Sequence, residues 1–246
     1  MSQKQSQADA ARAQRMKILG AVIGVAVILV AVAVVLSQSG SSGGGDVKGA
    51  SEVNSRFKDI PQSALTLGKP DAPVTLREFA DLKCPVCKKY NEQAFPVLVK
   101  DYVRTGKLRL EFATQAFVGE QQAPGDSEAA GRWAIAMGDQ NLAWNFIDLF
   151  YLNQQDEFKT YATDAYLTDL TNAIPGADAD AALAGQTSAK AKSVLDKSEQ
   201  EFSDAGFTGT PSFKLGKTGS TLEPFTAESF DPEVFTKAID ALLAAQ

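Results

Sequence analysis

The segment at residues 18–36 constrains this chain most, because it contains no charged and no strongly polar side chain. A helix of about 20 apolar residues is long enough to cross the hydrocarbon core of a bilayer. Polar sequence flanks this segment on both sides, which is not typical of a helix buried in a folded core. We therefore expect one transmembrane helix over 18–36, preceding the folded part of the chain.

The charges before this segment predict its orientation. Residues 1–17 carry four basic side chains against Asp9 alone, and the positive-inside tendency places such a terminus in the cytoplasm. The apolar segment is longer than that of a typical cleavable signal peptide, so we favour an uncleaved signal anchor over a cleaved signal. The rest of the chain is then expected outside the cytoplasm, at the cell membrane, where disulfides form and persist.

Composition separates a linker from the folded part and excludes several functions. Residues 37–54 begin with a glycine- and serine-rich run, which is typical of a flexible coil, so we expect the folded domain over 55–246. The net charge of −6 gives no electrostatic support for binding nucleic acid. The chain has no histidine, which excludes His-based triads and most zinc sites.

The folded part alternates short strands with helices and then becomes helical. Strands are expected at 64–67, 74–79 and 108–114, with a helix from about 84 to 102 in which Pro96 should cause a kink or a break. A helical crossover between two strands implies that they pair in parallel. Residues 126–205 have almost no strand signal, and a short strand from Ser212 and a helix capped by Asp231 follow. The predicted fold is α/β with a helical insertion at about 126–205.

The only two cysteines, Cys84 and Cys87, stand three residues apart in the sequence Cys-Pro-Val-Cys. A structural disulfide between them would close a very short loop and remove little entropy from the unfolded chain. A structural zinc site needs two further nitrogen or sulfur ligands, and the chain has neither another cysteine nor a histidine. A redox pair is the interpretation that fits both position and compartment best.

The expected start of a helix at Cys84 supports redox chemistry. Unpaired N–H groups and the helix dipole favour an anion there, which lowers the pKa of a thiol. Lys83, Lys88 and Lys89 add positive charge to the same stretch. Pro85 falls in the first turn, where its missing N–H costs nothing. We expect Cys84 to be the exposed nucleophile and Cys87 the more buried resolving thiol.

Two stretches together, residues 68–87 and Gly209-Thr-Pro-Ser-Phe213, resemble the DsbA-like branch of the thioredoxin superfamily. The resemblance spans about residues 60–246. It implies a thioredoxin-like fold and an active-site dipeptide of Pro85 and Val86. It also implies that Pro211 is cis and packs against the disulfide, and that Thr210 offers its backbone to a substrate peptide. Without the resemblance, Pro211 could simply begin a strand.

The resemblance also assigns a role to Glu78, six residues before Cys84. Similar proteins carry an acidic residue there, buried under the site, where it assists proton transfer to the resolving thiol. A solvent-facing Glu78 is the alternative, and Asp81 is expected to be a loop or helix-cap residue rather than a catalytic one. The strongest oxidants of the family have histidine where this chain has Val86, so a less oxidising disulfide is expected here.

The expected function is a membrane-anchored thiol–disulfide oxidoreductase that oxidises cysteine pairs of exported proteins through a Cys84–Cys87 disulfide. It should act as a monomer and need no metal or organic cofactor. By analogy with the family, a quinone-linked membrane oxidase would reoxidise it. A reductase or isomerase of the same fold and a non-catalytic peptide-binding module remain as alternatives.

Overall fold

The computed structural model describes residues 47–118 and 125–245. The predicted transmembrane helix at 18–36 and the basic N-terminus at 1–17 lie outside these residues. Within the described ranges, no helix is both long enough and apolar enough to span a bilayer.

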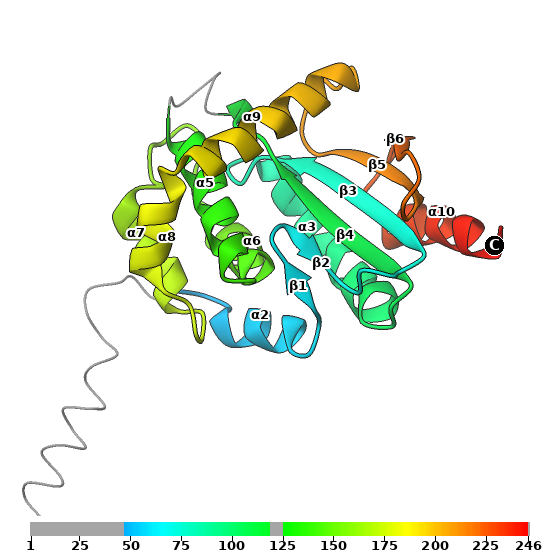
Figure 1. Cartoon of the computed structure of the whole chain (residues 1–246), viewed down its shortest axis with the longest axis horizontal. Coiled ribbons are helices and arrows are strands. Elements are labelled where there is room, and N and C mark those ends of the chain that lie inside the picture. The colour runs from blue at the N-terminus through cyan, green and yellow to red at the C-terminus, as the bar shows by residue number, and fades with distance from the viewer. Residues whose placement is uncertain (1–46, 119–124, 246) are drawn as a thin grey trace, which may run out of the picture. The chain divides into compact units, whose positions relative to one another are not determined.

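The domain is built around a six-stranded sheet in the order β1-β2-β4-β3-β5-β6 (Figure 1). Its two central strands, β3 (Val74–Ala80) and β4 (Leu108–Thr114), pair in parallel over seven residues. This confirms the pairing predicted from the helical crossover. Strand β5 (Ser212–Lys217) runs antiparallel on the other side of β3, and β6 (Glu223–Phe225) pairs with β5 at that edge.

The opposite edge of the sheet is a short hairpin of β1 (Gln62–Ser63) and β2 (Thr66–Leu67). The predicted strand at 64–67 is therefore too long at its start, because Ala64 adopts a positive φ of 50° in the turn of this hairpin. Strand β2 pairs with β4 only at Glu111 and Leu110. The last residues of β4 thus have no strand beside them on this side among the described residues.

Helices α3 (Pro85–Leu98) and α10 (Pro232–Ala244) pack together on one face of the sheet. Aromatic rings join the layers: Tyr90 of α3 lies 4.9 Å from Phe213 of β5 and 5.2 Å from Phe235 of α10, measured between ring centroids. As predicted, Asp231 caps α10 by accepting a hydrogen bond from the N–H of Glu233. This layer fixes the helix that carries the cysteines.

Pro96 does not break helix α3, so of the predicted kink or break the break is wrong. The helix continues to Leu98 and only then widens into a π-helical segment, η1 (Val99–Val103). A proline removes a single backbone donor from a helix. Buried neighbours on both sides, Phe95 and Leu98, hold the helix on the sheet despite that loss.

The predicted helical insertion is confirmed, and it comprises α5 (Asp126–Asp139), α6 (Ala143–Leu152), α7 (Asp164–Asn172), α8 (Ala179–Gln186) and α9 (Ala189–Asp204). Trp144 of α6 attaches the insertion to the sheet layer. Its ring stacks on Phe95 of α3 at 5.5 Å and meets Phe112 of β4 edge-on at 6.1 Å. Helix α9 contacts β4 and crosses the other face of the sheet (Figure 1), where its Phe202 ring lies 6.2 Å from Phe79.

The folded part begins earlier than the predicted residue 55, because helix α2 (Ala50–Phe57) occupies the end of the predicted linker. Its apolar side chains Val53 and Phe57 are buried in the main core. Arg56 forms an ion pair of 2.6 Å with the buried Asp148 of α6. Because this helix is short and half polar, composition alone does not separate it from the linker.

The close contact between α5 and β4 leads to a stability prediction. A Cβ atom added at Gly131 of α5 would lie 2.5 Å from the Thr114 hydroxyl oxygen. Such overpacking costs about 1–3 kcal/mol, more than the gain of about 1 kcal/mol from replacing a glycine inside a helix. We expect Gly131→Ala to lower the free energy of unfolding measured in urea.

The same substitution in a Thr114→Ala background supplies the control. There the added methyl group no longer meets the hydroxyl, so Gly131→Ala should be neutral or should raise the free energy of unfolding. An equal loss of stability in both backgrounds would show that this contact does not determine the effect.

Candidate active site

Strand β3 and helix α3 position the two cysteines. The strand ends at Ala80, four residues form a loop (residues 81–84, the Cys84 loop), and Cys84 is the N-cap residue of α3. Pro85 occupies the first helical position, and Cys87 lies in the first turn. Both cysteines are free thiols in this structure, so it describes the reduced site.

Cys87 is more deeply buried than Cys84, as predicted. Cys84 is 6% exposed and Cys87 is 0% exposed. The expectation that Cys84 is openly exposed is therefore wrong, because the surrounding loops cover most of it, although it is the more accessible of the two. The side chain of Val86 between them is 45% exposed.

The pKa of the Cys84 thiol is lowered to about 6 from its ordinary value. The largest cause is a side-chain hydrogen bond from Cys87, with further contributions from the Thr210 side chain and the backbone N–H groups of Cys87 and Val86, while burial acts in the opposite direction. These donors all favour the thiolate. Cys84 is thus the thiol that ionises near neutral pH.

The pKa of the Cys87 thiol moves the opposite way, well above its ordinary value. Burial is the main cause, and its interactions with Cys84 and the nearby Glu78 carboxyl add to it. Of the two thiols, Cys84 is therefore the stronger acid and Cys87 the weaker one. This difference gives the two sulfur atoms different chemistry.

The three nearby lysines do not act as predicted on the Cys84 thiol. Lys83 is completely buried and pairs with Asp126 at 2.6 Å, and Lys88 lies 3.8 Å from Glu92. The side chain of Lys89 is exposed. The groups that lower the Cys84 pKa come from Cys87, Val86 and Thr210 instead.

The loop before β5 brings Thr210 and Pro211 to the cysteines. The peptide bond between these two residues is cis, as the family resemblance implies. The Cys84 thiol donates a hydrogen bond of 3.5 Å to the Thr210 carbonyl oxygen. The Thr210 hydroxyl is buried and has no hydrogen-bond partner among the described residues, so it is a donor that can serve the Cys84 thiolate.

Glu78 is buried under the cysteines, which rules out the solvent-facing alternative. Its residue is 4% exposed, and the register of β3 places it between Phe112 and Phe213. Burial, followed by the Cys84 charge, raises the pKa of its carboxyl to about 8. One carboxyl oxygen has no hydrogen-bond partner among the described residues. Glu78 is therefore largely protonated at neutral pH.

The Cys84 loop is also held by side chains whose role the sequence analysis did not identify. Gln154 donates hydrogen bonds to the carbonyl oxygens of Leu82 (2.7 Å) and Cys84 (3.1 Å). The Tyr151 hydroxyl donates to the Asp81 carbonyl at 3.3 Å. These donors come from α6 and the residues directly after it, so the helical insertion holds the backbone that carries the nucleophile.

Two buried carboxylates complete the attachment of this loop. Asp81 accepts hydrogen bonds from the Ser127 hydroxyl and the N–H groups of Lys83 and Val118, and burial raises the pKa of its carboxyl. It is a loop residue as predicted, but the helix cap is Cys84. The Lys83 ammonium donates to Asp126 and to the Lys159 carbonyl. These partners are distant in sequence, and no local pattern indicates them.

A groove with a volume of about 430 Å³ lies beside the cysteines. It is lined by Val86, by the segment 206–213 that contains the cis-proline, and by residues of β6 and the following loop. Its position allows an extended peptide to approach Cys84 along Thr210. The described residues contain no cluster of three or more acidic or cysteine side chains that could hold a metal ion.

The Cys87 thiol should control the acidity of Cys84. Cys87→Ala removes the largest of the interactions that lower the Cys84 pKa, so the thiolate titration should move from about 6 toward the ordinary value of 9.0. Cys87→Ser keeps a hydroxyl donor and should cause a smaller shift. The ultraviolet absorbance of the thiolate as a function of pH measures both, and alanine and serine variants that titrate alike near 6 would contradict this account.

Buried Glu78 should make the stability of the reduced protein depend on pH. Its pKa is 4.5 in the unfolded chain and about 8 in the folded one, so unfolding releases a proton between these values. Stability then falls as pH rises through this window, by up to about 1.4 kcal/mol per pH unit. Glu78→Gln should abolish that slope in urea unfolding experiments.

Cys84 must be replaced in this experiment, because its lowered pKa gives a slope of opposite sign between about 6 and 9.0. The Cys84→Ser protein is therefore compared with the double variant that also carries Glu78→Gln. Parallel stability curves for these two proteins would contradict a buried, protonated Glu78.

Comparison with known proteins agrees with this geometry. A family model described as thioredoxin matches residues 62–241. A probable disulfide bond formation protein D from Bacillus cereus is 30% identical over 176 residues, which cover 71% of this chain and 76% of that protein. Disulfide bond formation protein D from Bacillus subtilis is 34% identical over 104 residues, or 42% of this chain and 46% of that protein.

Solved structures share the fold. Oxidised BdbD from Bacillus subtilis superposes with a TM-score of 0.62 at 23% identity, covering 76% of this chain and 100% of that one. DsbA from Chlamydia trachomatis superposes with a TM-score of 0.61 at 19% identity, covering 77% and 94% of the two chains. Together with the family model and the Bacillus cereus relative, which carry the assignment, this shows that the chain belongs to the DsbA-like family of the thioredoxin superfamily and is a thiol:disulfide oxidoreductase.

Proposed function

We propose that this protein is anchored in the cell membrane and oxidises cysteine pairs of exported proteins through a Cys84–Cys87 disulfide. The observation that supports this most is the contact of Cys84 with both Cys87 and Thr210, because it combines an acidic thiol with a peptide backbone open to a substrate. The names of the Bacillus relatives describe disulfide bond formation in those proteins.

The reaction begins when a substrate thiolate attacks the Cys84 sulfur of the oxidised protein. A new bond forms between the substrate and Cys84, the Cys84–Cys87 bond breaks, and Cys87 leaves with the electron pair and takes up a proton. The second substrate thiolate then attacks the substrate sulfur of this mixed disulfide, and Cys84 leaves as a thiolate. Two electrons pass to the protein, and the substrate gains a disulfide.

The pKa values of the Cys84 and Cys87 thiols suit these two steps. Cys84 ionises near neutral pH, so it is a good leaving group in the second step. Cys87 is a much weaker acid, so its thiolate needs a proton when the first step releases it. Protonated Glu78 lies below it, with one carboxyl oxygen that has no partner in the described part of the chain, and would supply that proton. Thr210 would pair with the substrate backbone, and Pro211 would pack against the sulfur atoms.

The sequence at 18–36 supports the proposed location. With residues 18–36 in the membrane, only residues 37–49 separate the bilayer from helix α2. An extended chain spans at most about 3.5 Å per residue, so the domain would stay within about 45 Å of the membrane surface. Substrates would be newly exported cysteine-containing proteins, and a quinone-linked membrane oxidase would reoxidise the protein.

Trapping of a mixed disulfide tests the proposed function. The full chain with Cys87→Ala cannot resolve the intermediate, so exported proteins should remain attached to Cys84 after an acid quench and alkylation. The matched control is Cys84→Ala with Cys87 intact, which lacks the nucleophile and should attach little. Mass spectrometry identifies the attached peptides and the cysteine that holds them.

Exported proteins attached to Cys84 would support the proposed function. Equal attachment in the Cys87→Ala and Cys84→Ala variants would contradict the assignment of Cys84 as the nucleophile. A chain without residues 1–36 should leave the membrane fraction if 18–36 is the anchor, and its retention there would contradict the anchor.

A further inference from the structure

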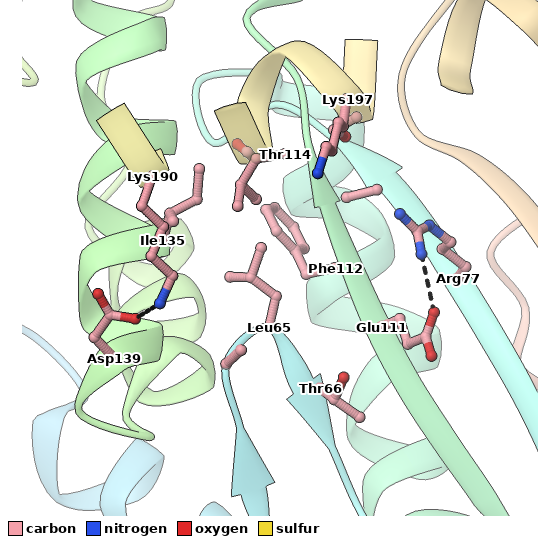
Figure 2. Close-up of a pocket in the computed structure, with 14 residues that line it drawn as sticks. Leu65, Thr66, Arg77, Glu111, Phe112, Thr114, Ile135, Asp139, Lys190 and Lys197 are labelled. Carbon is pink, nitrogen blue, oxygen red and sulfur yellow. Dashed lines mark hydrogen bonds and ion pairs between the residues drawn. The ribbon is translucent and has the colours of Figure 1, made fainter. Parts of the chain in front are cut away.

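A second cavity, with a volume of about 340 Å³, lies between the sheet and helices α5 and α9 (Figure 2). It shares no lining residue with the groove beside Cys84. It exists because β2 pairs with only two residues of β4, so the end of β4 faces helices instead of another strand. We refer to this space as the β4 cavity.

The middle of the β4 cavity is apolar. Figure 2 shows Leu65, Phe112 and Ile135 between two polar ends. One end holds the ion pair of Lys190 with Asp139, and the other holds Arg77 and Lys197. A mostly apolar pocket with a few polar groups at defined positions is the usual form of a small-molecule site.

The end with Arg77 carries an excess of positive charge. Arg77 contacts two carboxylates, Glu111 at 3.1 Å and Glu201 at 2.7 Å. These two carboxylates are shared with Arg109 (2.8 Å) and Lys214 (3.7 Å).

Lys197 lines the same end of the cavity and has no ion pair or hydrogen bond among the described residues. Of the residues that line this end, the two cations Arg77 and Lys197 lie beside one carboxylate, Glu111, and an added anion would be stabilised there.

Two lining residues also have buried polar atoms without a partner. Thr114 is 0% exposed and its hydroxyl forms no hydrogen bond among the described residues. The Arg77 Nε atom is likewise buried and unpaired within the part of the chain that the structure describes. An unsatisfied buried donor costs free energy, and a ligand oxygen would satisfy it.

We propose that the β4 cavity binds a small amphipathic carboxylate, with its apolar chain on Leu65, Phe112 and Ile135 and its carboxylate between Arg77 and Lys197. The volume lies near the lower end of the range for small-ligand pockets, roughly 300–1,000 Å³. A single medium-length chain fits this size, and a two-chain phospholipid does not. The excess positive charge favours the acid over a neutral alcohol of the same length.

Photolabelling of the full chain in lipid nanodiscs tests this site. The probe is decanoate that carries a diazirine on its chain, and proteolysis followed by mass spectrometry locates the label. We expect saturable labelling of the cavity segments at 64–66, 135–139 and 190–198. Decanoate should displace the probe at a concentration about tenfold lower than decanol does.

A charge reversal on α9 and a matched control decide the result. Lys197→Glu should weaken probe binding about tenfold or more. Lys192→Glu changes an exposed lysine of the same helix that pairs with Asp196 outside the cavity, and it should leave binding unchanged.

Equal labelling of the two variants, or equal competition by decanoate and decanol, would overturn the proposal. Val194 of α9 also lines the cavity, so Val194→Trp should fill it and abolish labelling, and persistent labelling of that variant would also overturn the proposal. Thiol–disulfide exchange by Cys84 does not enter these measurements, so they are independent of the proposed redox reaction.

Discussion

The contact between the Cys84 thiol and the cis-proline loop is the interaction on which the active site depends. It joins residues that are 126 positions apart in the chain, so it exists only when β3, β5 and α3 are in place. The helical insertion holds the other side of the nucleophile, because Gln154 binds the Cys84 carbonyl oxygen. Three separate parts of the chain thus meet at one residue, Cys84.

Burial then assigns different protonation states to groups that lie close together. Glu78 and Cys87 are buried, and burial is the main reason that both have raised pKa values. Cys84 is also buried, but donors from Cys87, Thr210 and the start of α3 outweigh that effect. Near neutral pH the site therefore holds one thiolate, one thiol and one protonated carboxyl. This is the arrangement that disulfide exchange with proton transfer requires.

Much of this arrangement could be predicted from the sequence, because Cys84, Cys87 and the Thr210-Pro211 pair belong to local motifs. The parallel strands and the helical insertion also follow from periodicity. The role of Lys83 could not be predicted, since a lysine beside a cysteine suggests a solvated charge, whereas its partner Asp126 is 43 residues away. Helix α2 could not be predicted for a related reason: its stability comes from packing Val53 and Phe57 into the core.

We infer that this fold stabilises the reduced form of the Cys84–Cys87 pair by favouring the Cys84 thiolate. A stabilised thiolate makes the disulfide more oxidising, while Val86 provides no side-chain donor to strengthen the effect further. The equilibrium with glutathione measures the reduction potential of the pair directly. We predict a value between that of thioredoxin, about −270 mV, and that of DsbA, about −120 mV. A value at or below about −270 mV would contradict the account.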